Sequence, residues 1–164
     1  FTPLQLATYC ATIANNGTRL KTHLVKQVTN YNRDQVISET EPEVVAQVDI
    51  SEENLKTVQE AMKGVTQSGG TANSVFGDYG ITIAAKTGTA ENPGHSDNVT
   101  FIAYAPYDDP EIAVAVVLEY GSRGTYSMNV AKDIFDAYFY GKTVDENGNL
   151  VMPEETNSSS TANE

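Results

Sequence analysis

Cysteine, tryptophan, basic residues and long apolar runs are scarce or absent in this sequence. The single cysteine, Cys10, excludes a disulfide within the chain, and there is no tryptophan. No apolar run approaches the roughly 18 residues of a membrane-spanning helix, and no signal peptide is recognisable. Only 10 Lys and Arg residues stand against 22 Asp and Glu, which gives a formal net charge of −12. This charge argues against nucleic acid as a partner and against direct contact with an anionic membrane surface, because both attract clustered cations.

The length of 164 residues fits one domain, and 40% hydrophobic with 20% charged residues is an ordinary globular composition. Because the chain begins at Phe1 rather than at methionine, we interpret it as a piece of a longer protein. Residues 1–141 are predicted to be folded. From residue 142 the composition turns polar and acidic, and residues 142–164 are expected to form a disordered tail, since little there is apolar.

Three helices are predicted from their caps and apolar periodicity. The first starts at Thr2, where Gln5 completes a Thr-x-x-Gln capping box, and it stops before Gly17. The second starts at Ser51, and the third is expected to start at Ser127. The expected buried stripe of the second helix is Leu55, Val58, Met62 and Val65. The expected buried face of the third helix is Val130, Ala131, Ile134, Phe135 and Tyr138.

Strand candidates cover about 79–88, 98–106 and 112–120, with a short one at 44–48 and a weak extended pattern in TRLKTHLVKQVTNY. The link PYDDPE suits an antiparallel hairpin, and the run IAVAVVLEY is typical of a strand covered on both faces. The order of helix, weak strands, helix, three strands and helix predicts an α+β fold in which helices pack against an antiparallel sheet.

The stretch YGITIAAKTGTAE, residues 79–91, places a lysine and two threonines where a strand ends. Its spacing nearly fits a phosphate-binding loop, because Gly80 lies six residues before Lys86 and Thr87 follows. That motif requires glycine where Ala85 stands, and the β-branched residues before it prefer an extended ladder, so we reject this interpretation. Two interpretations stay open on these residues alone: an exposed lysine at an ordinary strand end, or the Lys-Thr-Gly box of penicillin-binding proteins and serine β-lactamases.

Four segments together resemble the transpeptidase domain of penicillin-binding proteins, most closely that of the class B peptidoglycan transpeptidases. They are TPLQLATYCATIANNGT, NLKTVQEAMKGVTQSGGTA, KTGTAE and FIAYAPYDDPEIAVAVVLEYG, and they occur in the order of that family. The resemblance covers roughly residues 1–141 and implies the C-terminal part of the domain. Ala85 departs from the glycine of many members, which adds one methyl group behind the lysine.

In that family a serine attacks the penultimate D-alanine carbonyl of a peptidoglycan stem peptide, and an amino group of a neighbouring stem resolves the acyl-enzyme. β-Lactams acylate the same serine. The resemblance implies catalytic roles for Lys86, Thr87, Gly88 and Thr89, and substrate contacts for Thr87, Thr89 and Ala90. It implies a backbone oxyanion donor at Thr89, and neither a metal nor another cofactor. It also implies a location on the extracytoplasmic face of the bacterial membrane, with the anchoring helix outside this chain.

The nucleophile of the family, in a Ser-x-x-Lys motif, is missing, because no serine of this chain is followed by lysine three residues later. The SDN at 96–98 matches the second motif of the family, Ser-x-Asn, but it follows the Lys-Thr-Gly strand instead of preceding it. We expect Ser96 and Asn98 to form a turn. The chain alone is therefore predicted to be inactive, and without the upstream half of its domain it should associate or be poorly stable. The alternative is a non-catalytic homologue that uses the fold as a binding module.

Six further residues are of types that often have functional roles. Cys10 is expected to be a small core residue. Neither His23 nor His95 has a partner at metal-ligand spacing, and His95 is expected in a surface loop near the cleft. Arg123 could reach a substrate carboxylate, although a solvated loop arginine is the ordinary interpretation. Packing roles are expected for Tyr120 and Tyr126.

Overall fold

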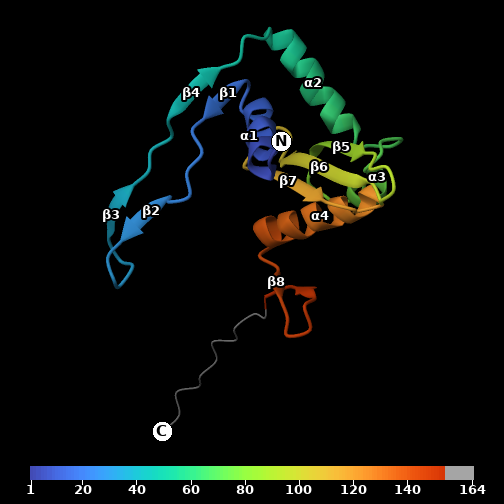
Figure 1. Cartoon of the computed structure of the whole chain (residues 1–164). Helices are drawn as coiled ribbons and strands as arrows, with labels where there is room; N and C mark the ends of the chain where they lie inside the picture. The colour runs from blue at the N-terminus through green and yellow to red at the C-terminus, as the bar shows by residue number, and fades with distance from the viewer. Residues whose placement is uncertain (154–164) are drawn as a thin grey trace.

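The computed structural model describes residues 1–153 and has a three-stranded antiparallel sheet at its centre, in the order β5-β6-β7 (Figure 1). The helices are α1 (Pro3–Ala14), α2 (Glu52–Gly64), α3 (Asn73–Phe76) and α4 (Gly124–Tyr140). The strands are β1 (Thr18–Leu20), β2 (Gln27–Thr29), β3 (Val36–Glu39), β4 (Val44–Gln47), β5 (Ala84–Ala90), β6 (Asn98–Ala105), β7 (Ile112–Leu118), β8 (Thr143–Val144) and β9 (Leu150–Val151). The predicted α+β class is confirmed.

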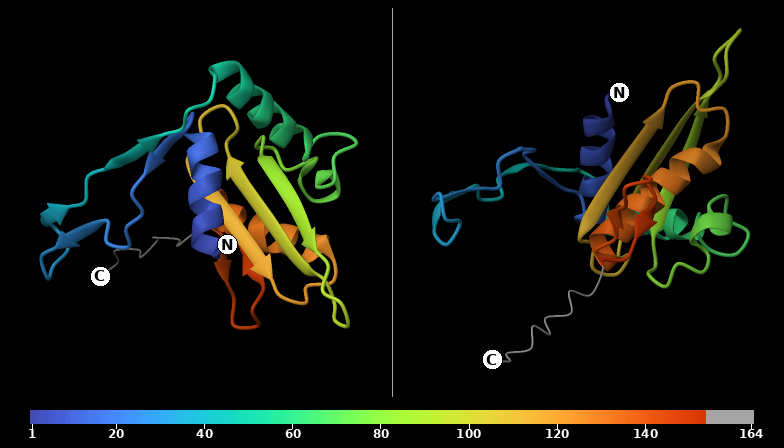
Figure 2. Two further views of the ribbon diagram at one scale, coloured as in Figure 1. Left: turned by 45° about the horizontal axis from the view of Figure 1, so that its top comes forward. Right: turned by 90° about the horizontal axis from the view of Figure 1, so that it is seen from below.

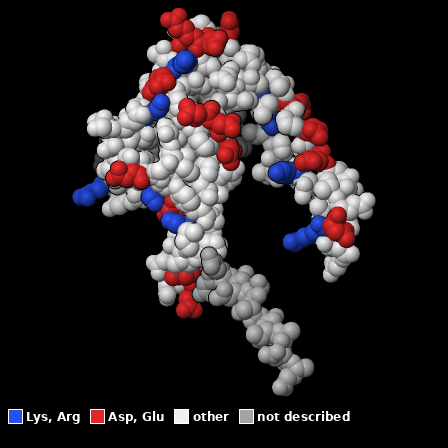
Figure 3. Space-filling view, turned by 180° about the vertical axis from the view of Figure 1, so that it is seen from behind, with Lys and Arg blue, Asp and Glu red and all other residues white. Residues whose placement is uncertain are grey.

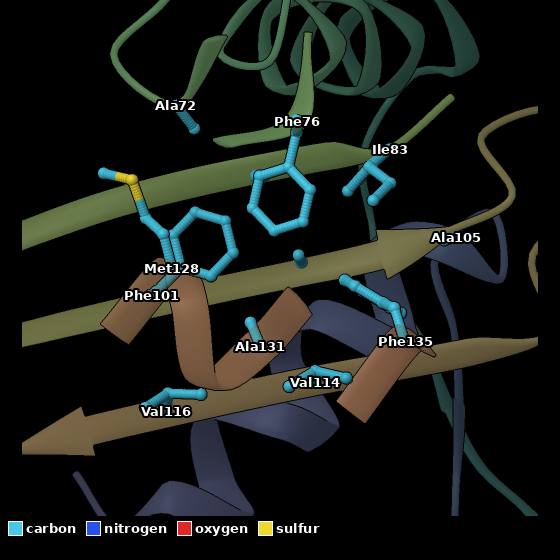
Figure 4. Close-up of a cluster of buried hydrophobic side chains, with 12 residues drawn as sticks. Ala72, Phe76, Ile83, Phe101, Ala105, Val114, Val116, Met128, Ala131 and Phe135 are labelled. Carbon is cyan, nitrogen blue, oxygen red and sulfur yellow. The ribbon is translucent and has the colours of Figure 1, made fainter. Parts of the chain in front are cut away.

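Helices cover both faces of this sheet (Figure 2). Helices α1 and α2 pack on one face, around a cluster that contains Cys10 and Ala84. Helix α4 packs on the other face, where Ala85, Phe101 and Phe135 belong to a second cluster (Figure 4). Successive residues of a strand point to opposite faces, so Ala84 and Ala85 anchor β5 in different clusters.

The first two helices begin as their sequences predict. In α1 the hydroxyl of Thr2 accepts from the Gln5 N–H at 3.2 Å, and the Thr2 N–H donates to Gln5 Oε1 at 2.8 Å. In α2 the hydroxyl of Ser51 accepts from the Asn54 N–H at 3.3 Å. Both caps depend only on residues three apart, which is why the sequence alone reveals them. On the predicted stripe of α2, Leu55 and Met62 are buried, whereas Val58 is exposed and Val65 is partly buried.

Helix α4 corrects two predictions. It begins at Gly124 with Arg123 as its N-cap residue, and Ser127 lies buried in the first turn with its hydroxyl donating to the Gly124 carbonyl at 2.8 Å. The predicted cap at Ser127 is therefore wrong, because this serine bonds back to the helix backbone instead of closing its start. Of the predicted buried face, Ala131 and Phe135 are buried. The exposed members of that face are Val130, Ile134 and Tyr138.

Strand β5 begins at Ala84, later than the predicted start at residue 79, because a turn occupies the intervening residues. Gly80 has a φ of +85°, which an extended strand does not allow. Tyr79 turns toward α4, where its hydroxyl donates to Asp136 at 2.8 Å. The predicted hairpin between β6 and β7 is confirmed.

Asp136 joins three segments at the end of α4. Its carboxylate is 3% exposed and accepts hydrogen bonds from Lys132, Lys142 and Tyr79, each at 2.8 Å. Burial alone would raise the pKa of this carboxyl, but the three donors outweigh burial and hold its pKa below the ordinary value. The folded protein therefore stabilises the ionised form.

Two parts of the chain lie outside the sheet and its helices. Strand β1 pairs with β4 and β2 pairs with β3, and the two pairs form an arm that projects from the body (Figures 1 and 2). Strand β4 confirms the strand predicted at 44–48. Strands β8 and β9 form a hairpin within residues 142–153, a part of the segment 142–164 for which disorder was predicted. Residues 154–164 lie outside the described part of the chain. No helix within residues 1–153 has the length and apolarity needed to cross a membrane.

Asp136→Asn is expected to lower the free energy of unfolding at pH 7 by about 1.5–3 kcal/mol, the usual contribution of hydrogen bonds to a charged group. Because the pKa of Asp136 is depressed in the folded state, its stabilisation is present above the unfolded-state pKa and is lost as pH falls through the folded-state pKa. Urea denaturation at pH 7 and at about pH 3 measures this difference. The exposed neighbour Asp133→Asn is the control. A difference that does not shrink at low pH would contradict the assignment.

Candidate functional site

The Lys-Thr-Gly-Thr segment lies on β5, which is an edge strand. Strand β5 pairs with β6 in antiparallel register, with Lys86 opposite Ile102 and Thr89 opposite Val99. Among residues 1–153 no strand pairs along its other edge. The regular ladder through Lys86 also agrees with the rejection of a phosphate-binding loop, whose backbone would have to curve away from a sheet.

Alternation along β5 divides the candidate residues between its two faces. Lys86, Gly88 and Ala90 face the side of α1 and α2, and Thr87 and Thr89 face the side of α4. Only Thr87 and Gly88 are partly buried, and the other three are exposed. The structure therefore brings the predicted site residues together on one open strand, with the ammonium group and the hydroxyls on opposite faces.

Lys86 bends back onto its own strand. Its Nζ donates a hydrogen bond to the carbonyl of Thr87, the next residue. Behind it, Ala85 is fully buried in the cluster with Phe101 and Ala103. The extra methyl group at Ala85, compared with glycine, is therefore taken up by the core and does not reach the open edge.

Gly88 is required by its partner on β6. A Cβ at this position would collide with the hydroxyl oxygen of Thr100, the residue directly opposite. No side chain therefore projects from this face of β5 at Gly88, and the side chain of Thr100 fills the space beside it.

A further hydroxyl, that of Thr71, lies at the site and was not predicted from the sequence. Its Oγ1 is 3.4 Å from Oγ1 of Thr87. The sequence predicted only a glycine-bearing loop here, although its GGTA segment was part of the family resemblance. Thr66 Oγ1 donates to the carbonyl of Ile83, the residue before β5, at 2.7 Å, and the N–H of Ala72 donates to the Val65 carbonyl at the end of α2 at 2.9 Å. These two hydrogen bonds therefore fix the loop that places Thr71 beside Thr87.

The turn after β7 is drawn tightly against the start of β6. The N–H of Tyr120 donates to Asn98 Oδ1 at 2.9 Å, and the N–H of Ser122 donates to the Asp97 carbonyl at 3.1 Å. Tyr120 and Ser122 have φ values of +54° and +61°, which is strained for residues other than glycine. Between them, a Cβ on Gly121 would come within 2.5 Å of Val99 Cγ2. Asn98 is the first residue of β6, so the turn expected at Ser96 and Asn98 does not include it, and its side chain instead accepts a hydrogen bond from the turn that follows β7.

The remaining candidates occupy ordinary positions. Cys10 is fully buried, and burial raises the pKa of its thiol to about 12, as fits the predicted core residue. Tyr120 and Tyr126, for which packing roles were predicted, are 56% and 53% exposed, so neither belongs to the core. The ring of His95 lies 5.4 Å from that of Tyr120, centroid to centroid. Residues 1–153 contain no cluster of side chains that could hold a metal ion.

Comparison with known proteins gives consistent matches. The model of the penicillin-binding protein transpeptidase domain matches residues 1–139. Penicillin-binding protein 2A of Bacillus subtilis is 36% identical over 158 residues, which cover 85% of this chain and 22% of that protein. The peptidoglycan D,D-transpeptidase MrdA of Haemophilus influenzae is 29% identical over 157 residues, which cover 84% of this chain and 23% of that protein. The chain thus spans about a fifth of the length of the curated relatives it matches.

A solved structure of a penicillin-binding protein also matches this chain. Penicillin-binding protein A of M. tuberculosis, determined as an imipenem acyl-enzyme complex, matches with a TM-score of 0.70 and 29% identity. The match covers 85% of this chain and 31% of that chain. The antiparallel sheet with its covering helices is therefore shared with this solved penicillin-binding protein.

Gly88→Ala is expected to lower the free energy of unfolding by about 1–3 kcal/mol, because the new methyl group meets the Thr100 hydroxyl. The double variant Gly88→Ala/Thr100→Ala should recover part of that loss, since the colliding group is then gone. A double-mutant cycle measured by urea denaturation gives the coupling between the two sites. Additive effects would show that Thr100 is not the reason for glycine at this position.

Proposed function

The chain belongs to the penicillin-binding protein transpeptidase family, and from this premise we propose that it forms one wall of the active site of a peptidoglycan D,D-transpeptidase. The observation that carries the proposal is the open edge of β5, where one ammonium group and several hydroxyls surround a strand able to pair with a peptide. An extended stem peptide would add to this edge as a further strand. β-Lactams would occupy the same place, and the M. tuberculosis relative has been solved as an imipenem acyl-enzyme complex.

Each candidate residue has a definite role in this proposal. Lys86 supplies positive charge beside the nucleophile, and Thr87 and Thr89 offer hydroxyls to the substrate carboxylate. The backbone N–H of Thr89 contributes to the oxyanion hole, where loss of one donor typically costs about 10²–10³ in rate. Gly88 and Ala90 leave room for the substrate to lie against the strand.

Thr71 adds a third side-chain hydroxyl that could donate a hydrogen bond to the substrate carboxylate. Its hydroxyl is 3.4 Å from that of Thr87, and both belong to segments held by the bond between Thr66 and the Ile83 carbonyl. Hydroxyl groups fixed by surrounding packing bind a carboxylate with little loss of side-chain entropy. We assign Thr71 to the substrate-binding set together with Thr87 and Thr89.

The nucleophile of this reaction would come from outside the chain. No serine here is followed by lysine three residues later, and the chain spans about a fifth of its curated relatives. The proposal therefore takes the upstream half of the same domain as the partner that brings the serine. The working enzyme would lie on the extracytoplasmic face of the membrane, held by an anchor outside these residues, where its peptidoglycan substrate is found.

Exposed apolar surface supports the need for that partner. Along α4, Val130, Ile134 and Tyr138 are 39–51% exposed. A groove of about 850 Å³ separates α1 from the base of the arm, with Leu4 and Val45 among its lining residues. Strand β7 has no paired neighbour beyond β6 within residues 1–153. Contiguous exposed apolar surfaces of this kind are typical of sites that a partner covers, whereas single exposed apolar side chains are not.

Labelling with a fluorescent penicillin tests the catalytic proposal. We expect the longer parent protein to be labelled and this chain alone to remain unlabelled, because only the parent contains the serine. In the parent, Thr71→Val and Thr87→Val should slow labelling about tenfold each through lost hydrogen bonds to the carboxylate. Thr57→Val is the matched control, since the Thr57 hydroxyl bonds only to the Glu53 carbonyl of its own helix.

The other results of this labelling experiment are equally informative. A folded parent that takes no label would favour the binding-module alternative. Labelling of this chain alone would overturn the claim that it lacks a nucleophile.

The isolated chain is expected to associate or to melt without cooperativity, because its open strand edges and apolar surfaces are uncovered. Light scattering on a size-exclusion column, together with a thermal melt, measures both properties. The double variant Val130→Gln/Ile134→Gln should reduce association of the chain, and Asp133→Asn on the same helix should leave it unchanged. A monodisperse monomer with a sharp melting transition would show that the upstream half is not needed for folding.

A further inference from the structure

Thr66 is a buried polar residue that lies between two segments of the proposed site. It follows the last residue of α2, Gly64, by two positions and is only 5% exposed. Its hydroxyl oxygen lies 2.7 Å from the carbonyl oxygen of Ile83, the residue before β5, and 3.0 Å from the carbonyl oxygen of Lys63 in the last turn of α2. A threonine hydroxyl has one proton to donate, and the closer acceptor is the Ile83 carbonyl. The Thr66 side chain therefore joins the end of a helix to the start of the Lys-Thr-Gly strand.

A second hydrogen bond ties Thr66 to α3. The side-chain amide of Asn73, the first residue of α3, donates to the Thr66 carbonyl at 3.1 Å. The loop of residues 67–72, which carries Thr71, is therefore flanked by two residues that are bonded to each other. Because Thr66 is also bonded to Ile83, a continuous path of hydrogen bonds runs from α3 through Thr66 to the residue before β5. A movement of the loop relative to the strand would have to break this path.

Few other directional contacts join this loop to β5. Between residues 65–73 and 82–90, the described structure shows one further hydrogen-bond contact, the exposed hydroxyl pair of Thr71 and Thr87 at 3.4 Å. The ion pairs within residues 1–153 involve neither the loop nor β5, and Figure 3 shows charged side chains spread over the rear surface of the molecule. Ala72 and Ile83 belong to one apolar cluster, but apolar packing does not fix direction as a hydrogen bond does. The buried Thr66 hydroxyl is therefore the contact that sets the spacing between loop and strand.

The position of Ile83 affects the proposed site residues that follow it. Lys86 comes three residues after Ile83, and the residues from Ala84 to Ala90 form an unbroken ladder with β6. A regularly paired strand transmits a displacement along its length, so a shift at Ile83 would also shift Lys86 and Thr89. Reactions between positioned groups depend steeply on alignment, and a misplacement of about 1 Å can cost about 10²-fold in rate. A contact remote from the substrate can therefore control the rate.

We infer that Thr66 is a positioning residue for the proposed acyl transfer, and that its buried hydroxyl holds the loop of residues 67–72 and β5 at the spacing that the reaction needs. The inference rests on the proposed function, because it concerns the rate of that reaction. Thr66 is buried and touches neither the serine nor the substrate, so it acts through Lys86 and the neighbouring hydroxyl groups. Without the hydroxyl, the Ile83 carbonyl loses this buried hydrogen bond, and the start of β5 is less firmly fixed.

Stopped-flow acylation of the longer parent protein by benzylpenicillin tests this inference. Thr66→Val removes the hydroxyl and keeps the shape of the side chain, and it should lower the acylation rate constant at saturation about 10- to 100-fold. The dissociation constant of the initial complex should change much less, because misalignment affects the transition state more than the ground state. Thr66→Ser keeps the hydroxyl and should recover most of the rate.

The matched control is Thr12→Val, which removes another buried threonine hydroxyl. Thr12 is 8% exposed, and its hydroxyl donates to the Thr8 carbonyl of its own helix at 2.7 Å. This variant should lower the melting temperature of the parent about as much as Thr66→Val does, without slowing acylation. If Thr66→Val does not fold, Thr66→Cys takes its place, because a thiol is a weaker donor and should slow acylation in the same direction by a smaller factor.

The results distinguish a failure of this inference from a failure of the function it rests on. If the wild-type parent is acylated and the variants without the Thr66 hydroxyl react at the wild-type rate, the positioning role is wrong and the transpeptidase proposal stands. Equal slowing in Thr12→Val would also overturn the role, since it would show a general effect of lost stability, and so would a Thr66→Ser variant as slow as Thr66→Val. If the folded wild-type parent is not acylated, both proposals fail together.

Discussion

Strand β5 is hydrogen-bonded along only one edge within the described residues, so its position must be fixed by side chains and by the loop before it. A second ladder would close the edge on which a peptide could pair. Ala84 and Ala85 meet this constraint by inserting into clusters on opposite faces of the sheet. Thr66 adds a buried hydrogen bond to the Ile83 carbonyl just before the strand begins. The strand is therefore held firmly at its start and stays accessible from Lys86 onward.

Two segments far apart in the sequence are drawn toward β5 and β6, and each depends on a glycine. Gly70 lies so close to the end of α2 that a Cβ would collide with the Val65 carbonyl, and Thr71 follows it. Gly121 lies equally close to Val99, and it fixes the turn before Arg123. Close backbone approach at these glycines brings Thr71 to Thr87 on β5 and brings the turn after β7 to the start of β6, although neither segment has a local motif that shows this.

The sequence predicted those features that depend on neighbouring residues. The caps of α1 and α2 could be recognised because Thr2 and Ser51 act on residues three positions away. The Lys-Thr-Gly box could be recognised because its residues are consecutive in the sequence and because three further segments of the same family occur around it in order. The cap predicted at Ser127 was wrong because the sequence alone does not distinguish a serine at the N-cap from a serine in the first turn. In the structure the Ser127 hydroxyl donates to the Gly124 carbonyl, which shows that Ser127 is already inside the helix. Contacts between Thr71 and β5 depend on how a loop folds back, which local patterns do not encode.

Charge placement also follows from this architecture. Asp136 binds both Lys132 and Lys142 at the far end of α4, so these two ammonium groups are held away from the open edge. Lys86 is then the basic residue that β5 itself carries, on the face opposite Thr87 and Thr89. In the proposed enzyme, a substrate along this edge would meet the ammonium group on one face of the strand and neutral hydroxyls on the other. The open edge therefore presents positive charge without a basic patch, because one lysine directly after the two buried alanines of the strand supplies it.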